Sequence, residues 1–221
     1  MFIILVSYRA RGVQEFRRKQ LMEALNNFRR FFEDRNVEYK IVVIEQNNDN
    51  KFNRGLLLNA AFLESEKLFT FPKKYIHMNA DYTFNLSNDF PEDFFNVNGF
   101  LDLYRSQWPV LGAACVFDPD SYKEINGFPN DLQGWGGDDW AIYNRIMTRK
   151  INLFTNKLFN SGFIIDHHVH FMNDITNNDK NIELANRNDI ENNGLTTLEY
   201  KVDGNGEFHG GNVFHYLINF D

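Results

Sequence analysis

The sequence predicts an α/β fold with a mostly parallel central sheet and flanking helices, and three observations lead to this prediction. Strand-like apolar segments alternate with helix-like segments through the first half of the 221-residue chain, which is the pattern of βαβ units. Each strand-like segment is followed by a polar loop. Hydrophobic residues make up 43% of the chain, which is enough for a substantial core.

The elements of the first half follow from hydrophobic periodicity. In chain order they are a strand at 2–8, a helix at 13–32, a strand at 39–44, a helix at 56–69 and a strand at 75–78. The first helix is well marked, because Leu25, Phe28 and Phe32 recur at helical spacing.

The second half is less regular. Residues 126–139 are rich in Gly, Pro, Asn and Asp, which is typical of a loop, and a helical pattern follows at 140–147. The Asn-rich stretch 173–193 predicts a surface loop with a short helix. Alternating residues at 197–202 and 213–220 predict a closing hairpin or edge strands.

Composition excludes several classes of protein. The chain has 23 Lys+Arg against 30 Asp+Glu, so a broad nucleic-acid-binding surface is not expected. Cys115 is the only cysteine, so no internal disulfide can form, as a reducing compartment would require. The apolar run 2–6 is too short for a membrane span, and no intrinsic membrane segment is expected.

Three loops are expected to meet at one edge of the sheet. In open α/β sheets, ligands bind beyond the carboxyl ends of the strands. The segments 7–11, 46–54 and 79–81 each follow a predicted strand. They should therefore converge on one crevice.

Asp81 and the pair His168 and His170 are candidate metal ligands. Asp81 follows a strand and could bind a divalent ion in the crevice, although such a residue also serves as a turn former or helix cap. Two histidines that are two residues apart in an extended segment point to the same side, although a polar strand end with solvated histidines is the alternative. A carboxylate with two imidazoles suits Mn²⁺ better than Mg²⁺.

The segment 134–139, Gly-Trp-Gly-Gly-Asp-Asp, is the most informative stretch. Gly136 and Gly137 allow close approach of the backbone to a ligand, and Trp135 offers a flat apolar face for a sugar ring. Asp138 and Asp139 open the following helix, where capping is the structural alternative. We expect Asp139 to act as a general base and Asp138 to accept hydrogen bonds from sugar hydroxyls.

Charged and aromatic residues in the same loops are candidates for donor binding. Arg9, Arg11 and Arg54 could contact a diphosphate or uridine, and Phe52 and Tyr8 could pack on a uracil ring. Ordinary surface arginines and core filling remain the alternatives.

These stretches together resemble the beta-1,4-galactosyltransferase family, whose members are inverting glycosyltransferases with the GT-A (Rossmann-like) fold. Residues 7–11 are similar to the family's P-F-R-x-R segment, and 52–59 to its F-N-R-x-x-L-L-N signature. Residues 125–139 resemble its N-G-F-P-N and W-G-W-G-G-E-D segments. Residues 168–170 resemble the H-x-H of the xylose-directed branch, and 194–200 resemble G-L-N-S-L-x-Y.

The resemblance implies Mn²⁺-dependent transfer of galactose or N-acetylgalactosamine from a UDP-sugar to a saccharide hydroxyl. By this likeness Asp81, His168 and His170 would hold the metal. Trp135 would organise the donor and acceptor sugars, and Asp139 would deprotonate the acceptor. Closure of the glycine-rich loop on donor binding is also implied.

Three positions depart from the family pattern. The family's D-V-D is Asn79-Ala80-Asp81 here, which predicts weaker metal affinity. Trp140 replaces an acid, which predicts a more apolar acceptor site. Val110 stands where galactose-specific relatives have a tyrosine, so UDP-GalNAc is expected as a donor as well as or instead of UDP-Gal.

Other interpretations remain open. Asn79 and Trp140 also fit a UDP-sugar-binding or carbohydrate-binding protein that has lost catalysis, and a W-G-G-E-like loop with a histidine ligand occurs in retaining N-acetylgalactosaminyltransferases. We expect a single GT-A catalytic domain over residues 1–221, with a nucleotide-binding half at about 1–110 and an acceptor and metal half at about 111–221. Without the anchor, stem and disulfides of animal Golgi relatives, a cytoplasmic enzyme of bacterial or viral type is expected.

Overall fold

The computed structural model describes residues 1–10, 14–70, 74–87, 96–103, 111–154, 164–166 and 178–220. The elements of the first part are β1 (Phe2–Tyr8), α1 (Gln14–Glu33), β2 (Tyr39–Gln46), α2 (Arg54–Leu68), β3 (Lys74–Asn79), β4 (Tyr82–Phe84) and β5 (Phe100–Asp102). Those of the second part are β6 (Ala114–Phe117), α4 (Pro119–Glu124), α5 (Asp138–Arg149), β7 (Leu153–Phe154), β8 (Ile164–Asp166), α6 (Asn178–Arg187), η2 (Leu195–Thr197), β9 (Lys201–Asn205) and β10 (Val213–Asn219).

The described strands form one large mixed sheet with the order β7-β5-β6-β3-β1-β2-β10-β9 and a small sheet of β4 and β8. The centre of the large sheet, β3-β1-β2-β10, is parallel, and antiparallel pairs flank it on both sides. In this register Ser7 lies opposite Asn79, and Tyr8 lies opposite Glu45. The carboxyl ends of β1, β2 and β3 therefore meet at one edge, as the sequence predicts.

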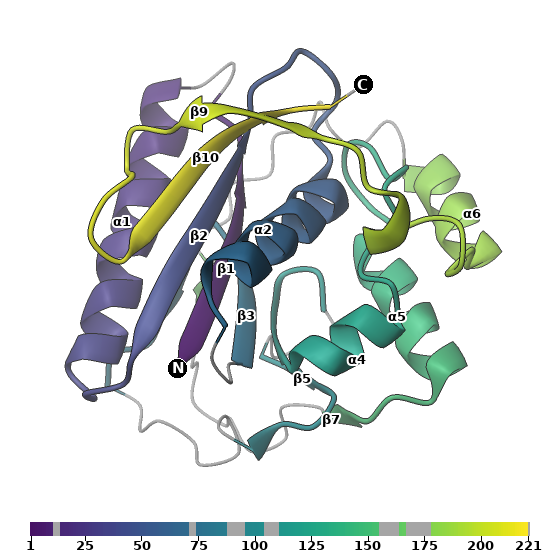
Figure 1. The fold of residues 1–221 in the computed structure, drawn as a ribbon, viewed down its shortest axis with the longest axis horizontal. Helices are drawn as coiled ribbons and strands as arrows, with labels where there is room; N and C mark the ends of the chain where they lie inside the picture. The colour runs from purple at the N-terminus through teal and green to yellow at the C-terminus, as the bar shows by residue number, and fades with distance from the viewer. Residues whose placement is uncertain are drawn as a thin grey trace.

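Helices cover both faces of the sheet, so the central strands are apolar along their whole length. All seven residues of β1 are buried. Phe28 and Phe32 of α1 belong to the core on one face, and Leu57 and Phe62 of α2 belong to the core on the other. Figure 1 shows α1 and α2 on opposite sides of the strands. The α/β fold with flanking helices is thus present.

The carboxyl-terminal tail forms the hairpin, one of the two arrangements expected from the sequence. The hairpin is confirmed, because β9 and β10 pair antiparallel. However, β10 is not an edge strand, since it also pairs in parallel with β2. Val213 and Ile218 of β10 are buried in the two cores, and this packing places the strand inside the sheet.

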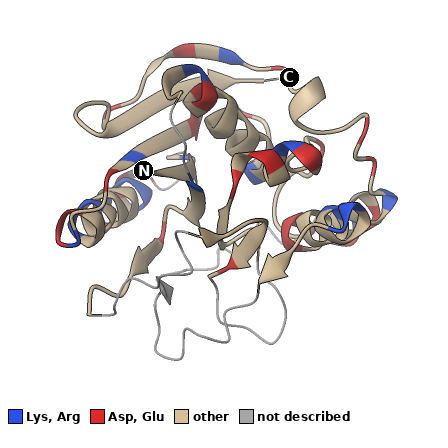
Figure 2. Ribbon diagram, turned by 60° about the horizontal axis from the view of Figure 1, so that its bottom comes forward, with Lys and Arg blue, Asp and Glu red and all other residues tan. Residues whose placement is uncertain are grey.

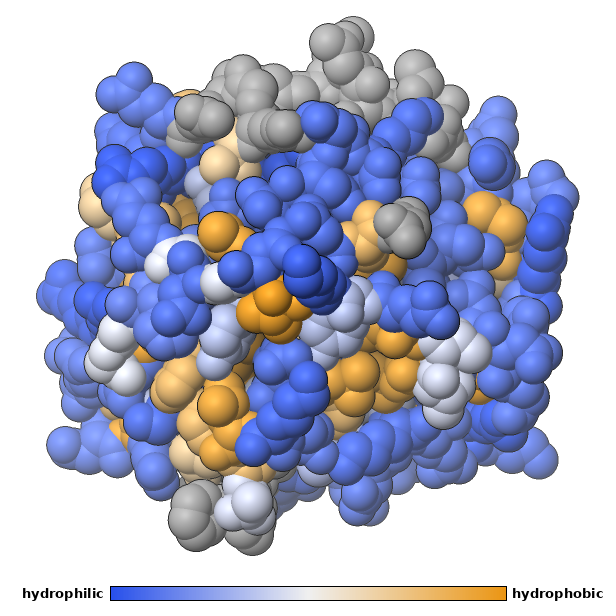
Figure 3. Space-filling model, turned by 45° about the horizontal axis from the view of Figure 1, so that its top comes forward, coloured by the Kyte–Doolittle hydropathy of each residue, from blue (hydrophilic) through white to orange (hydrophobic). Residues whose placement is uncertain are grey.

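The surface carries charges of both signs. Figure 2 shows acidic and basic residues interspersed along the helices, without a band of one sign. Apolar residues on the face shown in Figure 3 form separate patches between hydrophilic ones. Among the described residues, no helix combines the length and apolar character needed to span a bilayer.

Candidate active site

Arg54 joins three elements at the carboxyl edge of the sheet. It begins α2, and its Nη2 donates to Asp138 Oδ2 at 2.9 Å, at the start of α5. Its Nη1 donates to Asn79 Oδ1 at 3.4 Å, at the end of β3. Arg54 and Asn79, two of the residues predicted to bind the donor, therefore lie together with the predicted carboxylate pair.

The charges in this group depend on one another. Burial raises the pKa of Asp138, and the neighbouring Asp139 raises it further, while Arg54 opposes both effects. Burial alone would lower the pKa of Arg54, but the two carboxylates outweigh it and raise the pKa of the guanidinium. Arg54 thus stabilises the charged form of the buried Asp138 carboxylate.

Asp139 has a different environment from Asp138. It is partly exposed, and its Oδ1 accepts the Gly112 N–H at 2.5 Å. A Cβ on Gly112 would lie 2.5 Å from Arg54 Nη2 and 2.8 Å from Asp139 Oδ1, so a larger residue there would displace the ends of these two side chains. Sequence reasoning missed Gly112, because no local motif marks a residue that is brought to the site by the sheet.

The glycine-rich loop is tied to the F-N-R segment. The Gly134 N–H donates to the Phe52 carbonyl at 2.7 Å. Gly137 has φ +85° at the start of α5, and a Cβ there would lie 2.8 Å from the Asn181 carbonyl oxygen. Trp135 projects from this loop and is 44% exposed. The loop is therefore backed by α6 and presents an indole to the surface.

Asp81 lies two residues after the end of β3, and its side chain is almost fully buried. Arg17 Nη1 of α1 is 3.4 Å from Asp81 Oδ2. Tyr82, the next residue, pairs with Asp166 at the end of β8. His168 and His170 lie outside the described residues, as do Arg11 and Val110. Within the ranges that are described, no group of three potential metal ligands is found.

The aromatic candidates lie mostly in the core. Tyr8 is 3% exposed, and its ring packs edge-on against His215 at 6.3 Å. Burial, together with the charge of Glu45, raises the pKa of the Tyr8 phenol. Phe52 is partly buried against the core that contains α2. Both positions agree with the core-filling alternative, and Arg9 is partly buried beside Tyr8.

Two sequence motifs interlock around Asn59. Its Nδ2 donates to the Phe128 carbonyl at 2.8 Å, and its Oδ1 accepts the Phe128 N–H at 3.0 Å. The same Oδ1 accepts the Tyr122 hydroxyl at 2.8 Å. Asn53 Nδ2 donates to the Asn130 carbonyl at 2.6 Å. The F-N-R-x-x-L-L-N and N-G-F-P-N segments therefore hold each other in place.

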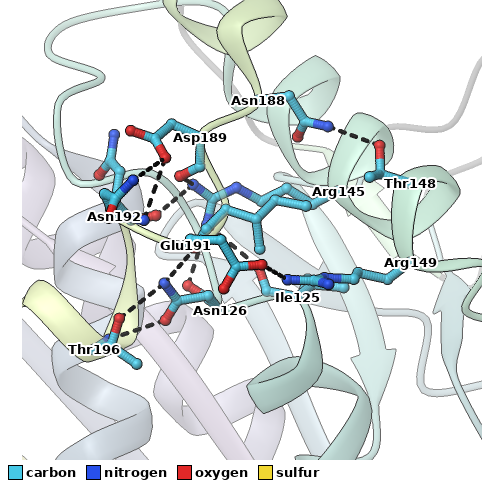
Figure 4. Close-up of polar contacts among 12 residues, drawn as sticks. Ile125, Asn126, Arg145, Thr148, Arg149, Asn188, Asp189, Glu191, Asn192 and Thr196 are labelled. Carbon is cyan, nitrogen blue, oxygen red and sulfur yellow. Dashed lines mark hydrogen bonds and ion pairs between the residues drawn. The ribbon is translucent and has the colours of Figure 1, made fainter.

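Arg145 fixes the back of the same region. The guanidinium donates to five backbone carbonyls, those of Ile125, Asn126, Gly127, Asp189 and Asn193. Arg145 is 1% exposed, and burial lowers its pKa to about 10, so it remains charged at neutral pH. Figure 4 shows Arg145 between the chain at Asn126 and the turn at Asp189. This residue positions the loop that precedes the glycine-rich segment.

Two family models match the chain. The model described as the N-terminal region of glycosyl transferase group 7 matches residues 2–84, and the model described as the N-terminal domain of galactosyltransferase matches residues 104–170. Together they cover more than half of the sequence, including the interlocking motifs and the glycine-rich loop. The chain belongs to the beta-1,4-galactosyltransferase family.

Curated relatives agree with this assignment. The nematode (Caenorhabditis elegans) xylosylprotein 4-beta-galactosyltransferase is 27% identical over 144 residues, which are 62% of this chain and 49% of that protein. Mouse (Mus musculus) beta-1,4-galactosyltransferase 7 is 24% identical over 194 residues, which are 84% of this chain and 58% of that protein. The chain thus matches about half the length of these galactosyltransferases.

Solved structures confirm the GT-A galactosyltransferase fold. The catalytic domain of Drosophila beta-1,4-galactosyltransferase 7, solved with xylobiose, matches with a TM-score of 0.77 at 18% identity. The match covers 100% of this chain and 94% of that one. A mutant of the same Drosophila enzyme, solved with manganese, UDP-Gal and xylobiose, matches equally well.

The expectation of a cytoplasmic enzyme of bacterial or viral type is wrong. The curated galactosyltransferases compared above come from animals, a nematode and the mouse. The expectation rested on features missing from the sequence, and such absences do not identify a source or a compartment.

Proposed function

We propose that this member of the family transfers galactose from UDP-galactose to a hydroxyl of a saccharide acceptor, with Mn²⁺ as cofactor and with inversion at the anomeric carbon. The observation that carries the proposal is the convergence of Arg54, Asn79, Asp138 and Asp139 at the carboxyl edge of the sheet. The Drosophila neighbour was solved with manganese, UDP-Gal and xylobiose, the ligands that such a reaction uses.

Asp139 is assigned as the general base. Its Oδ1 is held by the Gly112 N–H, which orients the carboxylate, and its side chain is partly exposed. In the reaction the proton of the acceptor hydroxyl passes to Asp139. The hydroxyl oxygen bonds to C1 of galactose on the face opposite UDP, and the bond from C1 to the phosphate oxygen breaks. UDP leaves with that electron pair, so the configuration at C1 is inverted.

Arg54 is assigned to positioning, because it already bonds Asp138 and Asn79. By these bonds Arg54 holds the start of α5 against the end of β3. Asp139 is thereby kept beside the strand ends, where the donor is expected to bind. Asp138 is buried, so its main contribution is to anchor Arg54. Donor contacts by Tyr8, Arg9, Arg11 and Phe52, and acceptor contacts by Trp135, Gly136, Gly137 and Trp140, remain predictions.

A divalent ion is proposed to bind beyond the end of β3. Asp81 supplies a carboxylate, and the Tyr82–Asp166 pair brings the end of β8 beside it. The proposed ligands are Asp81, His168 and His170, whose mixed oxygen and imidazole chemistry suits Mn²⁺. When bound, the ion would neutralise charge that builds up on the diphosphate.

The donor sugar is proposed as galactose, in line with the family. Use of UDP-GalNAc stays a prediction that depends on Val110, which is outside the described residues. A donor panel decides it, since turnover of UDP-Gal alone contradicts the prediction. The whole of residues 1–221 is proposed to act as one catalytic domain, with the donor half preceding the acceptor half.

The activity of the wild-type protein and of a variant of the proposed general base, Asp139, tests the proposal. Purified protein with UDP-galactose, Mn²⁺ and a panel of saccharide acceptors should release UDP and form a galactosylated product. Asp139→Asn should lower kcat by about 100-fold or more, because the proton acceptor is lost. Asp120→Asn is the matched control, since Asp120 is an exposed aspartate in the first turn of α4, and it should retain wild-type kcat. Wild-type kcat in Asp139→Asn would remove Asp139 from the mechanism.

A further inference from the structure

Two exposed tryptophans flank the carboxylate pair of α5. Trp135 is 44% exposed and Trp140 is 46% exposed, with Asp138 and Asp139 between them in the chain. Indole side chains are normally well buried, because they carry a large apolar area. Exposure of two of them beside a polar site therefore indicates apolar faces that a ligand covers.

Trp140 is held in one orientation by two contacts. Its Nε1–H donates to Asn186 Oδ1 of α6 at 2.6 Å. Its ring stacks on Tyr143, with centroids 5.7 Å apart and an interplanar angle of 24°. A fixed aromatic ring loses little further freedom when a ligand binds, so it is prepared for stacking.

The position of this ring connects it to the proposed site of reaction. Tyr143 is four residues after Asp139 and three after Trp140, and residues at these spacings lie on the same side of a helix. Helical side chains also lean toward the amino-terminal end, which here is the end that carries Asp139. Tyr143 therefore lies on the same side of α5 as Asp139 and Trp140, and the Trp140–Tyr143 stack begins one residue after the proposed general base.

We propose that Trp140, backed by Tyr143, is a stacking platform for the second sugar ring of an oligosaccharide acceptor whose first ring lies at Asp139. This proposal rests on the galactosyl transfer proposed above. A pyranose ring has an apolar C–H face that packs on an indole and hydroxyls at its edge. Asn186 places an amide beside the indole, which suits a sugar better than an alkyl or aryl group.

Matched pairs of acceptors test the platform. Xylose and xylobiose, glucose and cellobiose, and N-acetylglucosamine and its β-1,4-linked disaccharide differ only in the second ring. The readout is the ratio of kcat/KM for the disaccharide to kcat/KM for the monosaccharide. Because both values come from one preparation, the ratio is independent of the folded fraction.

The variants separate the aromatic face from its support. Trp140→Ala should lower the ratio about three- to tenfold, which is the usual contribution of one aromatic stack. Trp140→Phe keeps a ring and should recover part of the ratio. Met147→Ala is the control, since Met147 is 52% exposed on the same helix, and it should keep the wild-type ratio.

Each other outcome has a definite meaning. An unchanged ratio in Trp140→Ala overturns the platform while leaving galactosyl transfer intact. Methyl and phenyl β-xyloside are assayed beside these pairs, and a loss in Trp140→Ala that appears only with these glycosides overturns the assignment to a sugar ring. Wild-type protein that transfers galactose to none of the acceptors overturns the proposed function together with the platform.

Discussion

The protonation of His77 links the fold to pH, and its effect on stability can be worked out. His77 lies on β3, is 1% exposed, and packs against the rings of Phe117 and Phe128 at 6.1 and 5.6 Å. Within the described structure neither ring nitrogen makes a well-formed hydrogen bond. Burial, and then the charge of Arg54, lowers the pKa of His77 to about 3, against a small opposing effect of the Leu111 backbone.

The sign follows from proton uptake by the two states. An unfolded histidine has a pKa of about 6.5, so below that pH the unfolded chain binds a proton that the native chain excludes. The contribution of neutral His77 to stability is therefore complete above pH 6.5 and is lost as the pH falls toward 3. Between pH 7 and pH 5 this loss amounts to about 2 kcal/mol.

Urea denaturation at pH 7 and pH 5 measures this loss. Wild-type protein should lose about 2 kcal/mol more free energy of unfolding over this interval than His77→Phe or His77→Gln does. Both variants remove the titrating ring, but they differ in polarity and can therefore differ in stability at pH 7. Their free energy of unfolding should nevertheless change less with pH than that of the wild type. If all three proteins lose the same free energy, His77 is not a buried neutral group and the reasoning fails.

Other substitutions test the supports of the site. Arg145→Leu leaves five buried carbonyls without their donor and should cost about 3–5 kcal/mol, or roughly 10 °C in Tm by calorimetry. Arg187→Leu breaks only an exposed pair with Glu183 and should cost under about 1 kcal/mol; equal losses in the two would contradict the role of Arg145. Gly112→Ala brings a methyl group onto Arg54 and Asp139 and should lower kcat/KM about tenfold or more. Gly204→Ala meets no atom within 4 Å but strains a backbone at φ +159°, so it can lower stability and should leave kcat/KM unchanged. Normal kinetics in Gly112→Ala would show that the contact of Asp139 with Gly112 is not needed.

Long periodic segments of the fold could be predicted from sequence. The strand at 2–8 has the bounds of β1, because an uninterrupted apolar run between polar loops has few other solutions. Strands such as β5 and β6 could not be assigned in this way, since three or four residues give no measurable period. The place of β10 beside β2 depends on pairing between distant segments, which local patterns do not encode.

The sequence predicted which loops meet at the candidate site, but it predicted fewer of the contacts between their side chains. The strand-end rule brought Arg54 and Asn79 to one edge, and the helix start brought Asp138 and Asp139 there. The ion pair between Arg54 and Asp138 was not foreseen, because sequence does not show which of two adjacent carboxylates is buried.

Gly112 and His77 were missed for a related reason. The role of each residue depends on Arg54, which is distant in the chain: Gly112 leaves room for its guanidinium, and its charge lowers the pKa of His77. The predicted ligands His168 and His170 remain predictions.

Metal-dependent transfer of galactose with inversion leaves a defined product, which one reaction can identify. UDP-galactose and a saccharide acceptor are incubated with the protein and Mn²⁺, and the new linkage is analysed by proton NMR. We expect a β-galactoside that forms with Mn²⁺, no longer forms when EDTA is added, and forms again when excess Mn²⁺ is restored. An α-galactoside, or undiminished turnover in EDTA, would contradict it.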